Sequence, residues 1–383
     1  MPSAISQPPR LRKWERPSKT AYDLPWADIK VIDISTFDEP GEKEKLAEQL
    51  RDAVHKTGFF SITGTGVSDQ EVQRQYDIGQ AFFDLPLEKK SLPECRCDFG
   101  NGNYFGYRAA YEKKIMSTNI TNIEESFNVP KIIPQYENEV RHPFFEPYRP
   151  EIEDFSRKAL NIASKIFTLF SLILELPPDY FSSRHAYDAP SEDHLRYMTY
   201  HPRSVADDAK VANTWSRAHT DFGSLTLLWN QNIAGLQIKT STGEWKYVPP
   251  VPTDRPGGGG GGDTTGIICN VGDTLSFWSA GYLKSTTHRV VRPPEDQTHV
   301  DRLGLFYFVR PGDDVDIKPV ASPLLKRLGL VGERQEGEAS QEKVTGLQYV
   351  RERVKSYHNH SDYADMKGKT FRVGDLEIED EAD

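Results

Sequence analysis

The stretch RAHTDFGSLTLLWNQNIAGLQI at residues 217–238 places a histidine and an aspartate two positions apart, ahead of an apolar run typical of a β-strand. In a strand, residues i and i+2 point to the same face of the sheet. His219 and Asp221 would therefore present an imidazole nitrogen and a carboxylate oxygen side by side. Such a pair can hold a metal ion if a third ligand lies nearby.

The surrounding sequence predicts that this pair sits in a protein core made of strands. From about residue 193 onward, short apolar segments alternate with turn residues over about 120 residues. Eight closely spaced strands favour a two-sheet sandwich or jelly roll. The segments are LRYMTYHP, SLTLLWN, AGLQIKT, WKYVPP, GIICNV, TLSFWSA, HRVVRP and RLGLFYFVRP. The glycine run at 257–262 predicts a disordered insertion between strands, over 253–264, without a chemical role.

The first half of the chain predicts a mixture of helices and strands. Apolar alternation favours strands at 29–35 and 59–63, and apolar residues four apart favour a helix over 42–57. Ser68 and Glu71 have capping-box spacing at the start of a second helix, which Pro86 ends. The longest helical pattern, 149–176, has a broad apolar stripe and predicts a largely buried helix.

We therefore expect a mixed α/β protein with a β core, a jelly roll flanked by N-terminal helices and a C-terminal helix. The predicted regions are a flexible arm (1–27), an N-terminal α/β region (28–185), the β core (186–320), and a linker with a final helix and an acidic tail (321–383). The final helix, at about 343–358, has one apolar face and should dock on the body. The tail is expected to be a solvated end.

Composition excludes some classes of partner. Lysine and arginine total 47 against 57 aspartate and glutamate, a net charge of −10, so nucleic acid and anionic membranes are not expected partners. Three cysteines without zinc spacing favour a reducing compartment, and no secretory signal or long apolar run is present. We expect a cytoplasmic protein. The sequence predicts no oligomeric state.

His288 is the predicted third metal ligand. It begins the strand HRVV, and the strands between it and His219 can bring it back across a closed sandwich. Two histidines and one carboxylate on one face of an ion are the arrangement of non-haem Fe(II) enzymes that activate O2. Two rival HxD pairs exist, His299/Asp301 in a predicted surface turn and His360/Asp362 in the polar tail.

Arg302 and Tyr200 are candidates for binding an anion beside the metal. An arginine buried at the start of RLGLFYF would be costly without an anion, and a dicarboxylate co-substrate would supply one. Its fork can hold a carboxylate through two hydrogen bonds, with the Tyr200 hydroxyl as a second donor. The alternative is an exposed arginine paired with Asp301 or Glu295.

With these elements in order, the chain resembles the isopenicillin N synthase-like family of Fe(II)- and 2-oxoglutarate-dependent oxygenases. The N-terminal resemblance is carried by VIDIS, GFFSITGTGV and AFFDLPLEKK. The catalytic resemblance is carried, in order, by HTDFGSLTLL, GLQI, NVGDTLSFWS, KSTTHRVV and RLGLFYF. It implies a double-stranded β-helix, iron ligands at His219, Asp221 and His288, and Arg302 with Tyr200 on the distal carboxylate of 2-oxoglutarate.

The implied activity is oxidation of a small organic substrate by O2, with 2-oxoglutarate converted to succinate and CO2. Hydroxylation, desaturation or ring rearrangement of an intermediate of specialised metabolism would be the outcome. Candidate substrate-side residues, two of which are arginines that suggest an acidic group on the substrate, are Tyr104, Tyr107, Arg108, Arg196, Phe306 and Phe308.

Two residues depart from the family pattern at the co-substrate site. Gly304 stands where the family has a serine that also bonds the distal carboxylate, and Met198 stands where many plant members have asparagine. Weaker 2-oxoglutarate binding follows, because a hydrogen bond to a charged group contributes roughly 1.5–3 kcal/mol. Three alternatives stay open: an Fe(II) oxidase that needs no keto acid, a non-catalytic jelly-roll module that retains a metal, and a final helix and tail that recruit a protein partner.

Overall fold

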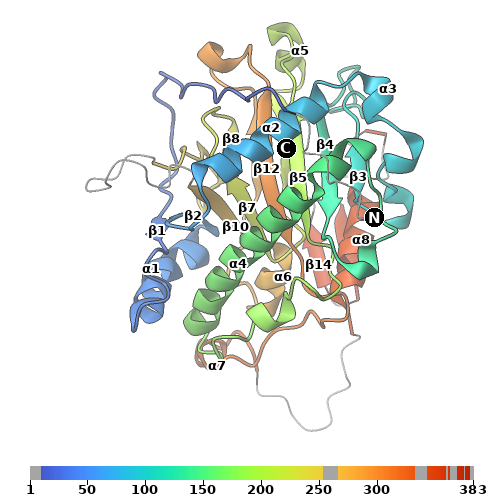
Figure 1. Cartoon of the computed structure of the whole chain (residues 1–383). Helices are drawn as coiled ribbons and strands as arrows, with labels where there is room; N and C mark the ends of the chain where they lie inside the picture. The colour runs from blue at the N-terminus through green and yellow to red at the C-terminus, as the bar shows by residue number, and fades with distance from the viewer. Residues whose placement is uncertain are drawn as a thin grey trace, which may run out of the picture.

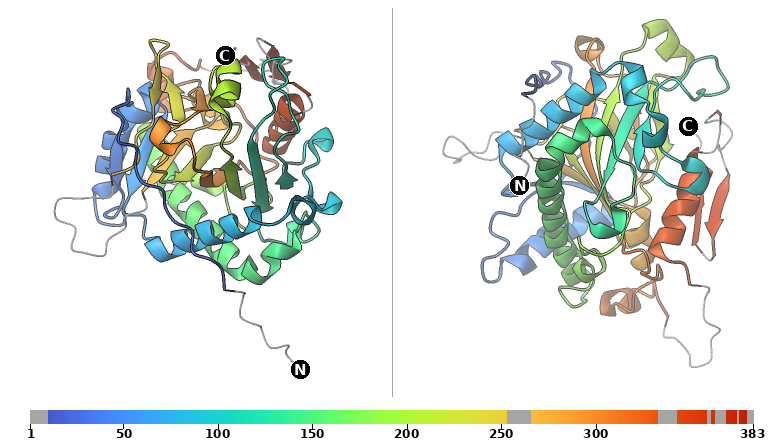
Figure 2. Two further views of the ribbon diagram at one scale, coloured as in Figure 1. Left: turned by 90° about the horizontal axis from the view of Figure 1, so that it is seen from above. Right: turned by 45° about the vertical axis from the view of Figure 1, so that its right-hand side comes forward.

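The computed structural model describes residues 10–252, 266–332, 343–358, 361–362, 369–374 and 376–379. Within these residues, two β-sheets face each other and helices cover the outer face of the larger one (Figures 1 and 2). The architecture is a double-stranded β-helix, as the family resemblance implies, and it agrees with the jelly roll that the strand pattern predicts. The glycine-rich insertion lies outside the described residues, as does His360.

The larger sheet has the strand order β1-β2-β10-β7-β12-β5-β4-β3. Its β1–β2 pair is parallel and all its other pairs are antiparallel. In sheet order, the strands are β1 Val31–Asp33, β2 Phe59–Thr63, β10 Ile267–Val271, β7 Leu225–Trp229, β12 Arg302–Val309, β5 His194–Tyr200, β4 Glu124–Pro130 and β3 Gly106–Arg108. The sheet takes strands from both predicted halves of the chain, so residues 28–185 and 186–320 share one core.

The smaller sheet has the order β6-β11-β8-β9, and all its pairs are antiparallel. Its strands are β6 Thr214–His219, β11 His288–Val291, β8 Leu236–Lys239 and β9 Trp245–Tyr247. Apolar side chains of both sheets meet between them, among them Met198, Leu228, Leu236 and Val290. This inner layer surrounds the cavity described below.

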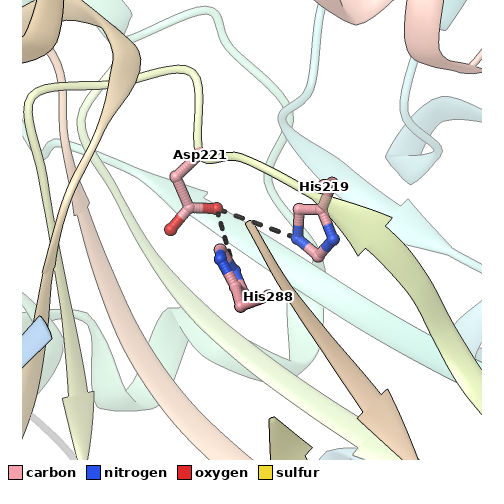
Figure 3. Close-up of side chains that lie close together, drawn as sticks. All are labelled: His219, Asp221 and His288. Carbon is pink, nitrogen blue, oxygen red and sulfur yellow. Dashed lines mark ion pairs between the residues drawn. The ribbon is translucent and has the colours of Figure 1, made fainter. Parts of the chain in front are cut away.

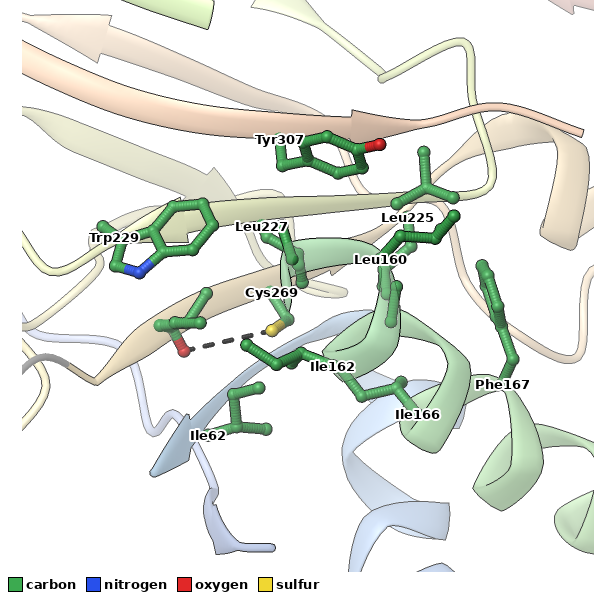
Figure 4. Packing of buried hydrophobic residues seen from close by; sticks show 14 of the residues in the cluster. Ile62, Leu160, Ile162, Ile166, Phe167, Leu225, Leu227, Trp229, Cys269 and Tyr307 are labelled. Carbon is green, nitrogen blue, oxygen red and sulfur yellow. Dashed lines mark hydrogen bonds between the residues drawn. The ribbon is translucent and has the colours of Figure 1, made fainter. Parts of the chain in front are cut away.

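Three helices pack on the outer face of the larger sheet. They are α1 Glu42–Lys56, α2 Asp69–Phe83 and α4 Arg149–Ile173. The apolar stripe of α4 is buried as predicted, and Figure 4 shows Ile162 of this helix beside Cys269 of the sheet. The predicted capping box at the start of α2 is confirmed, because Ser68 and Glu71 bond each other's backbone N–H groups.

The remaining helices are shorter or lie at the ends of the sandwich. They are α3 Leu87–Lys90, α5 Val205–Lys210, α6 Asp273–Trp278, α7 Pro323–Arg327 and α8 Gly346–His358. Helix α8 docks on the body as expected, and its buried Tyr349 hydroxyl donates to Asp273 at 3.1 Å. No helix among the described residues is both long and apolar enough to cross a membrane.

Two expectations need correction, and the structure adds strands that the sequence does not predict. The segment TLSFWSA forms α6 instead of a strand, since a short apolar run fits either periodicity. Strands β3 and β4 were not predicted. The described part of the arm lies against the body: Trp14 is buried and stacks on Tyr76, with ring centroids 4.2 Å apart. The tail begins with strand β14 Leu376–Glu379, which pairs with β13 Thr370–Val373.

Candidate functional site

The predicted metal ligands meet at one end of the smaller sheet. Strand β6 ends at His219, and Asp221 follows in the turn, so the pair meets across a turn and not along one strand face. His288 begins β11 and lies directly opposite His219 in the sheet. Asp221 Oδ1 lies 3.9 Å from His219 Nε2 and 3.8 Å from His288 Nε2 (Figure 3). One ion can contact all three atoms.

Hydrogen bonds orient each ligand toward that point. His219 Nδ1 lies 2.8 Å from the carbonyl oxygen of Arg217, and His288 Nδ1 lies 3.0 Å from that of Thr286. With Nδ1 donating to a carbonyl, Nε2 of each ring is left as the metal-binding atom. Asp221 Oδ2 accepts hydrogen bonds from Thr226 Oγ1 and Asn270 Nδ2, both at 2.6 Å, which leaves Oδ1 facing the histidines.

The protonation states of the ligands suit a metal. Burial raises the pKa of Asp221, but His288, His219 and the two hydrogen bonds outweigh it and bring this pKa to about 2. Burial and the neighbouring His288 lower the pKa of His219 to about 3. At neutral pH, the site therefore offers a carboxylate and a neutral imidazole, the forms that coordinate metal ions.

The start of α6 holds the turn that carries Asp221. The backbone N–H of Asp273 donates to the Asp221 carbonyl at 2.8 Å, and that of Thr274 donates to the Gly223 carbonyl at 3.1 Å. Gly272 permits this approach, since a Cβ there would lie 2.2 Å from the Gly223 oxygen. The sequence GD that opens α6 is thus part of the support for the ligand set.

Neither rival pair forms such a site. His299 and Asp301 are both exposed, and Asp301 interacts with the ring of His201 at 3.2 Å. Of the other pair, only Asp362 lies among the described residues. Within the part of the chain that the structure describes, His219, Asp221 and His288 are the one group of three such residues close enough to share an ion.

A cavity between the two sheets opens onto these ligands, and Arg302 and Tyr200 lie on its wall. Arg302 is 2 % exposed, and no carboxylate among the described residues lies within ion-pair distance of it. Its Nε has no hydrogen-bond partner, and its guanidinium lies 5.5 Å from the Tyr200 ring, its partner across the β12–β5 ladder. The alternative of an exposed Arg302 paired with Asp301 or Glu295 is wrong, and the cavity has a buried cation ready for an anion.

Five of the six candidate substrate-side residues also line this cavity: Tyr104, Arg108, Arg196, Phe306 and Phe308. Tyr107 does not. Its neighbour on β3, Arg108, faces the cavity, whereas the side chain of Tyr107 alternates to the opposite face of the sheet. There it is fully buried in the helix-covered core and its hydroxyl donates to Glu125 at 2.5 Å.

Gly304 has a specific neighbour. A Cβ built on it would lie 2.6 Å from Cε2 of the Phe306 ring, which therefore fills the space that a side chain at position 304 would take. Met198 lies directly across the ladder from Gly304, and it too lines the cavity. The wall beside Arg302 is thus apolar at both positions where the family pattern has a polar residue.

Among the site residues that the sequence analysis does not predict are Thr226 and Asn270, which bond Asp221, and Arg310 and Tyr357, which line the cavity. Tyr357 comes from α8, and its ring centroid lies 6.0 Å from that of His219. Helix α8 is therefore a wall of the cavity. Period-2 alternation within SLTLL and IICNV offers a signal for Thr226 and Asn270, whereas no local pattern marks Arg310 and Tyr357.

Comparison with known proteins agrees with this geometry. Residues 192–311 match the model of the 2OG-Fe(II) oxygenase superfamily, and residues 29–148 match that of the N-terminal region of non-haem dioxygenases in morphine synthesis. The chain belongs to the Fe(II)- and 2-oxoglutarate-dependent oxygenases. It is therefore an enzyme, a non-haem oxygenase that uses Fe(II) and 2-oxoglutarate.

Individual relatives of this oxygenase are distant. A 2-oxoglutarate-dependent dioxygenase (citB) of Monascus ruber is 27% identical, with 79% of this chain and 89% of that protein covered. A proline hydroxylase (buaE) of Petromyces alliaceus is 25% identical, with coverage of 78% and 92%. The solved structure of a full-length Neurospora crassa protein in complex with alpha-KG and thymine superposes with a TM-score of 0.69 at 22% identity, covering 88% of this chain and 100% of that one.

Proposed function

We propose that this oxygenase inserts oxygen into, or removes hydrogen from, a C–H bond of a small organic molecule, an intermediate of specialised metabolism. In the hydroxylation case, one substrate, one O2 and one 2-oxoglutarate yield the alcohol, succinate and CO2. The single observation that carries the proposal is the pairing of a three-residue ligand set with a buried Arg302 that has no carboxylate partner, in one cavity.

His219, Asp221 and His288 would hold Fe(II), which together with 2-oxoglutarate activates O2 for attack on the substrate. Arg302 would bind the distal carboxylate of 2-oxoglutarate through its fork, with the Tyr200 hydroxyl as a further donor. The surrounding side chains keep water out and hold the substrate, so that the reacting C–H bond is placed before oxidation begins. Tyr104, Arg108, Arg196, Phe306 and Phe308 are the proposed substrate-side residues.

An apolar wall at Gly304 and Met198 weakens the co-substrate site but leaves its cation intact. Burial lowers the pKa of Arg302, since the charged form is removed from water without a carboxylate beside it. Binding a dicarboxylate relieves this cost. For this reason the use of 2-oxoglutarate is favoured over the keto-acid-independent oxidase.

We also propose a cytoplasmic location. Cys95, Cys97 and Cys269 are free thiols, and two of them are buried, as suits a reducing compartment.

The test is the visible charge-transfer band of a keto acid chelated to Fe(II), recorded without oxygen. We expect the band with the wild-type protein, its loss in His288→Ala, and a much higher 2-oxoglutarate requirement in Arg302→Met. His299→Ala is the matched control, because His299 is exposed and does not belong to the group of three proposed ligands. Admission of O2 should then release succinate. Iron binding without a band, or a band that survives His288→Ala, would contradict the proposal.

A further inference from the structure

The cavity is far more basic than the chain around it. Although the net charge of the chain is −10, the cavity wall carries five arginines, Arg108, Arg196, Arg217, Arg302 and Arg310, against two carboxylates, Glu124 and Asp221. Fe(II) and 2-oxoglutarate carry opposite charges of equal size. Binding both therefore leaves the balance of charge on the cavity wall unchanged.

Two of these arginines already have an assigned partner. Arg108 forms an ion pair with Glu124 inside the cavity wall. Arg302 faces the proposed co-substrate carboxylate. Among the rest, Arg196 and Arg310 are both buried, at 8 % and 4 % exposed, and neither lies within 4 Å of any carboxylate of the described residues.

Arg310 is fixed in place but its guanidinium is not satisfied. Its backbone N–H donates to Asp193 Oδ1 at 2.5 Å, whereas its Nε and Nη1 have no hydrogen-bond partner. Glu192 and Asp221 act on it only at longer range, and Glu192 is engaged by Arg351 at 2.9 Å. A buried cation with orphaned donors is costly unless a ligand supplies the acceptors.

Arg196 is held in a fixed orientation by its neighbours. Its Nε donates to Asn128 Oδ1 at 2.6 Å, and its guanidinium lies over the rings of Tyr104 and Phe308 at 4.6 and 4.1 Å. His194 lies beside this guanidinium: Arg196 Nη2 lies 3.3 Å from its Nε2. Burial and both arginines hold the pKa of His194 well below its usual value, so both guanidinium groups act on this one imidazole.

Arg196 and Arg302 start from different points along the β12–β5 ladder, and Arg310 follows the end of β12. In the β12–β5 ladder, Arg302 is opposite Tyr200 and Arg196 is opposite Phe306, four residues further along each strand. Four residues of strand span about 13 Å. The cavity therefore has two cationic ends, and one of them is left over when the co-substrate is in place.

We propose that Arg196 and Arg310 form a subsite for a carboxylate of the substrate, whose apolar or aromatic body packs against Tyr104, Phe222 and Phe308. The inference rests on the proposed function and names the substrate class: an organic acid. The planar forks of the two arginines match a carboxylate, and the aromatic walls match a flat apolar body. A neutral molecule of the same shape would leave both cations unpaired.

The test compares acids with their neutral amides in a binding experiment. Benzoate, phenylacetate and 3-phenylpropionate, their primary amides, and thymine are titrated by calorimetry into the protein loaded with Fe(II) and 2-oxoglutarate without oxygen. We expect at least one acid to bind about ten-fold or more tightly than its amide, the effect of hydrogen bonds to a charged group. Arg310→Met and Arg196→Met should abolish this preference.

Arg289→Met is the matched control. Arg289 neighbours His288 on β11, but its guanidinium lies over Trp245, outside the cavity wall, so the preference for the acid should persist. The charge-transfer band is recorded first for every variant and shows that it is folded and loaded. A wild-type protein without the band refutes the proposed function. A band with no preference for any acid over its amide, or with thymine as the tighter ligand, overturns the carboxylate subsite alone.

Discussion

Thr226→Val tests how strongly the fold orients the proposed iron ligands. The Thr226 hydroxyl donates to Asp221 Oδ2 at 2.6 Å, and Asn270 donates to the same oxygen. Together they hold the other oxygen toward His219 and His288, at 3.9 and 3.8 Å from their Nε2 atoms. Valine keeps the shape of threonine and removes the hydroxyl. The substitution therefore changes the orientation of the carboxylate and leaves the three ligands in place.

The expected loss can be estimated from the hydrogen bonds. A bond to a charged group contributes roughly 1.5–3 kcal/mol, and loss of an outer-shell partner typically lowers metal affinity about 10- to 100-fold. Because Asn270 still holds Asp221 Oδ2 at 2.6 Å, we expect the lower part of this range. The Kd for Fe(II) should rise by about 10- to 30-fold, which corresponds to about 1.4–2 kcal/mol.

The assay is an anaerobic titration of the apoprotein with Fe(II), in which calorimetry measures the Kd for the metal. Thr63→Val is the matched control, since the buried Thr63 hydroxyl on β2 has no hydrogen-bond partner and lies outside the cavity wall. Its Kd should match that of the wild type. An unchanged Kd in Thr226→Val, or an equal loss in Thr63→Val, would refute the reasoning that the hydroxyl orients the ligand.

Three further predictions concern the co-substrate wall, pH and the arm. Gly304→Ser restores the family residue but should weaken 2-oxoglutarate binding in the charge-transfer titration, because the serine Cβ would lie 2.6 Å from the Phe306 ring. Adding Phe306→Leu should recover binding. Tighter binding of 2-oxoglutarate in the single variant would contradict this expectation. Burial lowers the pKa of His201, but hydrogen bonds to Asp301 and Glu125 outweigh it and raise this pKa to about 9. The resulting stability, about 2–3 kcal/mol, is fully present below pH 6.5 and is lost as the pH rises through about 9, so urea unfolding of His201→Gln should lack this fall between pH 6.5 and 9.5. Trp14→Ala should lower the free energy of unfolding by about 3 kcal/mol, the cost of removing a large buried ring, whereas the exposed Lys13→Ala should not; equal effects would refute the docking of the arm.

Local sequence patterns predict many of the strands and helices of this protein. The strands with clear alternation or apolar runs, such as β2, β5 and β12, lie where the sequence predicts them, and so do the capped helix α2 and the striped helix α4. The segment TLSFWSA forms a helix and not the predicted strand, because so short and only partly apolar a segment does not distinguish helix from strand. The backbone hydrogen bonds of Asp273 and Thr274 to the turn at Asp221 decide for α6. The sequence predicts a loose arm, and this is wrong for its described part, because the stacking partner of Trp14 is Tyr76, which lies beside it only in the folded protein.

By itself, the sequence predicted the proposed ligand types, their order along the chain and the class of chemistry, since His219, His288 and Arg302 stand in recognisable strand contexts and Asp221 follows His219 by two residues. Only the tertiary structure decided how these residues meet. Pairing of β11 with β6 brings His288 opposite His219, and the alternation of β3 sends Tyr107 into the core while Arg108 faces the cavity. The role proposed for Arg310 likewise depends on folding. Its guanidinium is buried with Nε and Nη1 lacking a hydrogen-bond partner, and this is a property of the packed surroundings that no local stretch of sequence predicts.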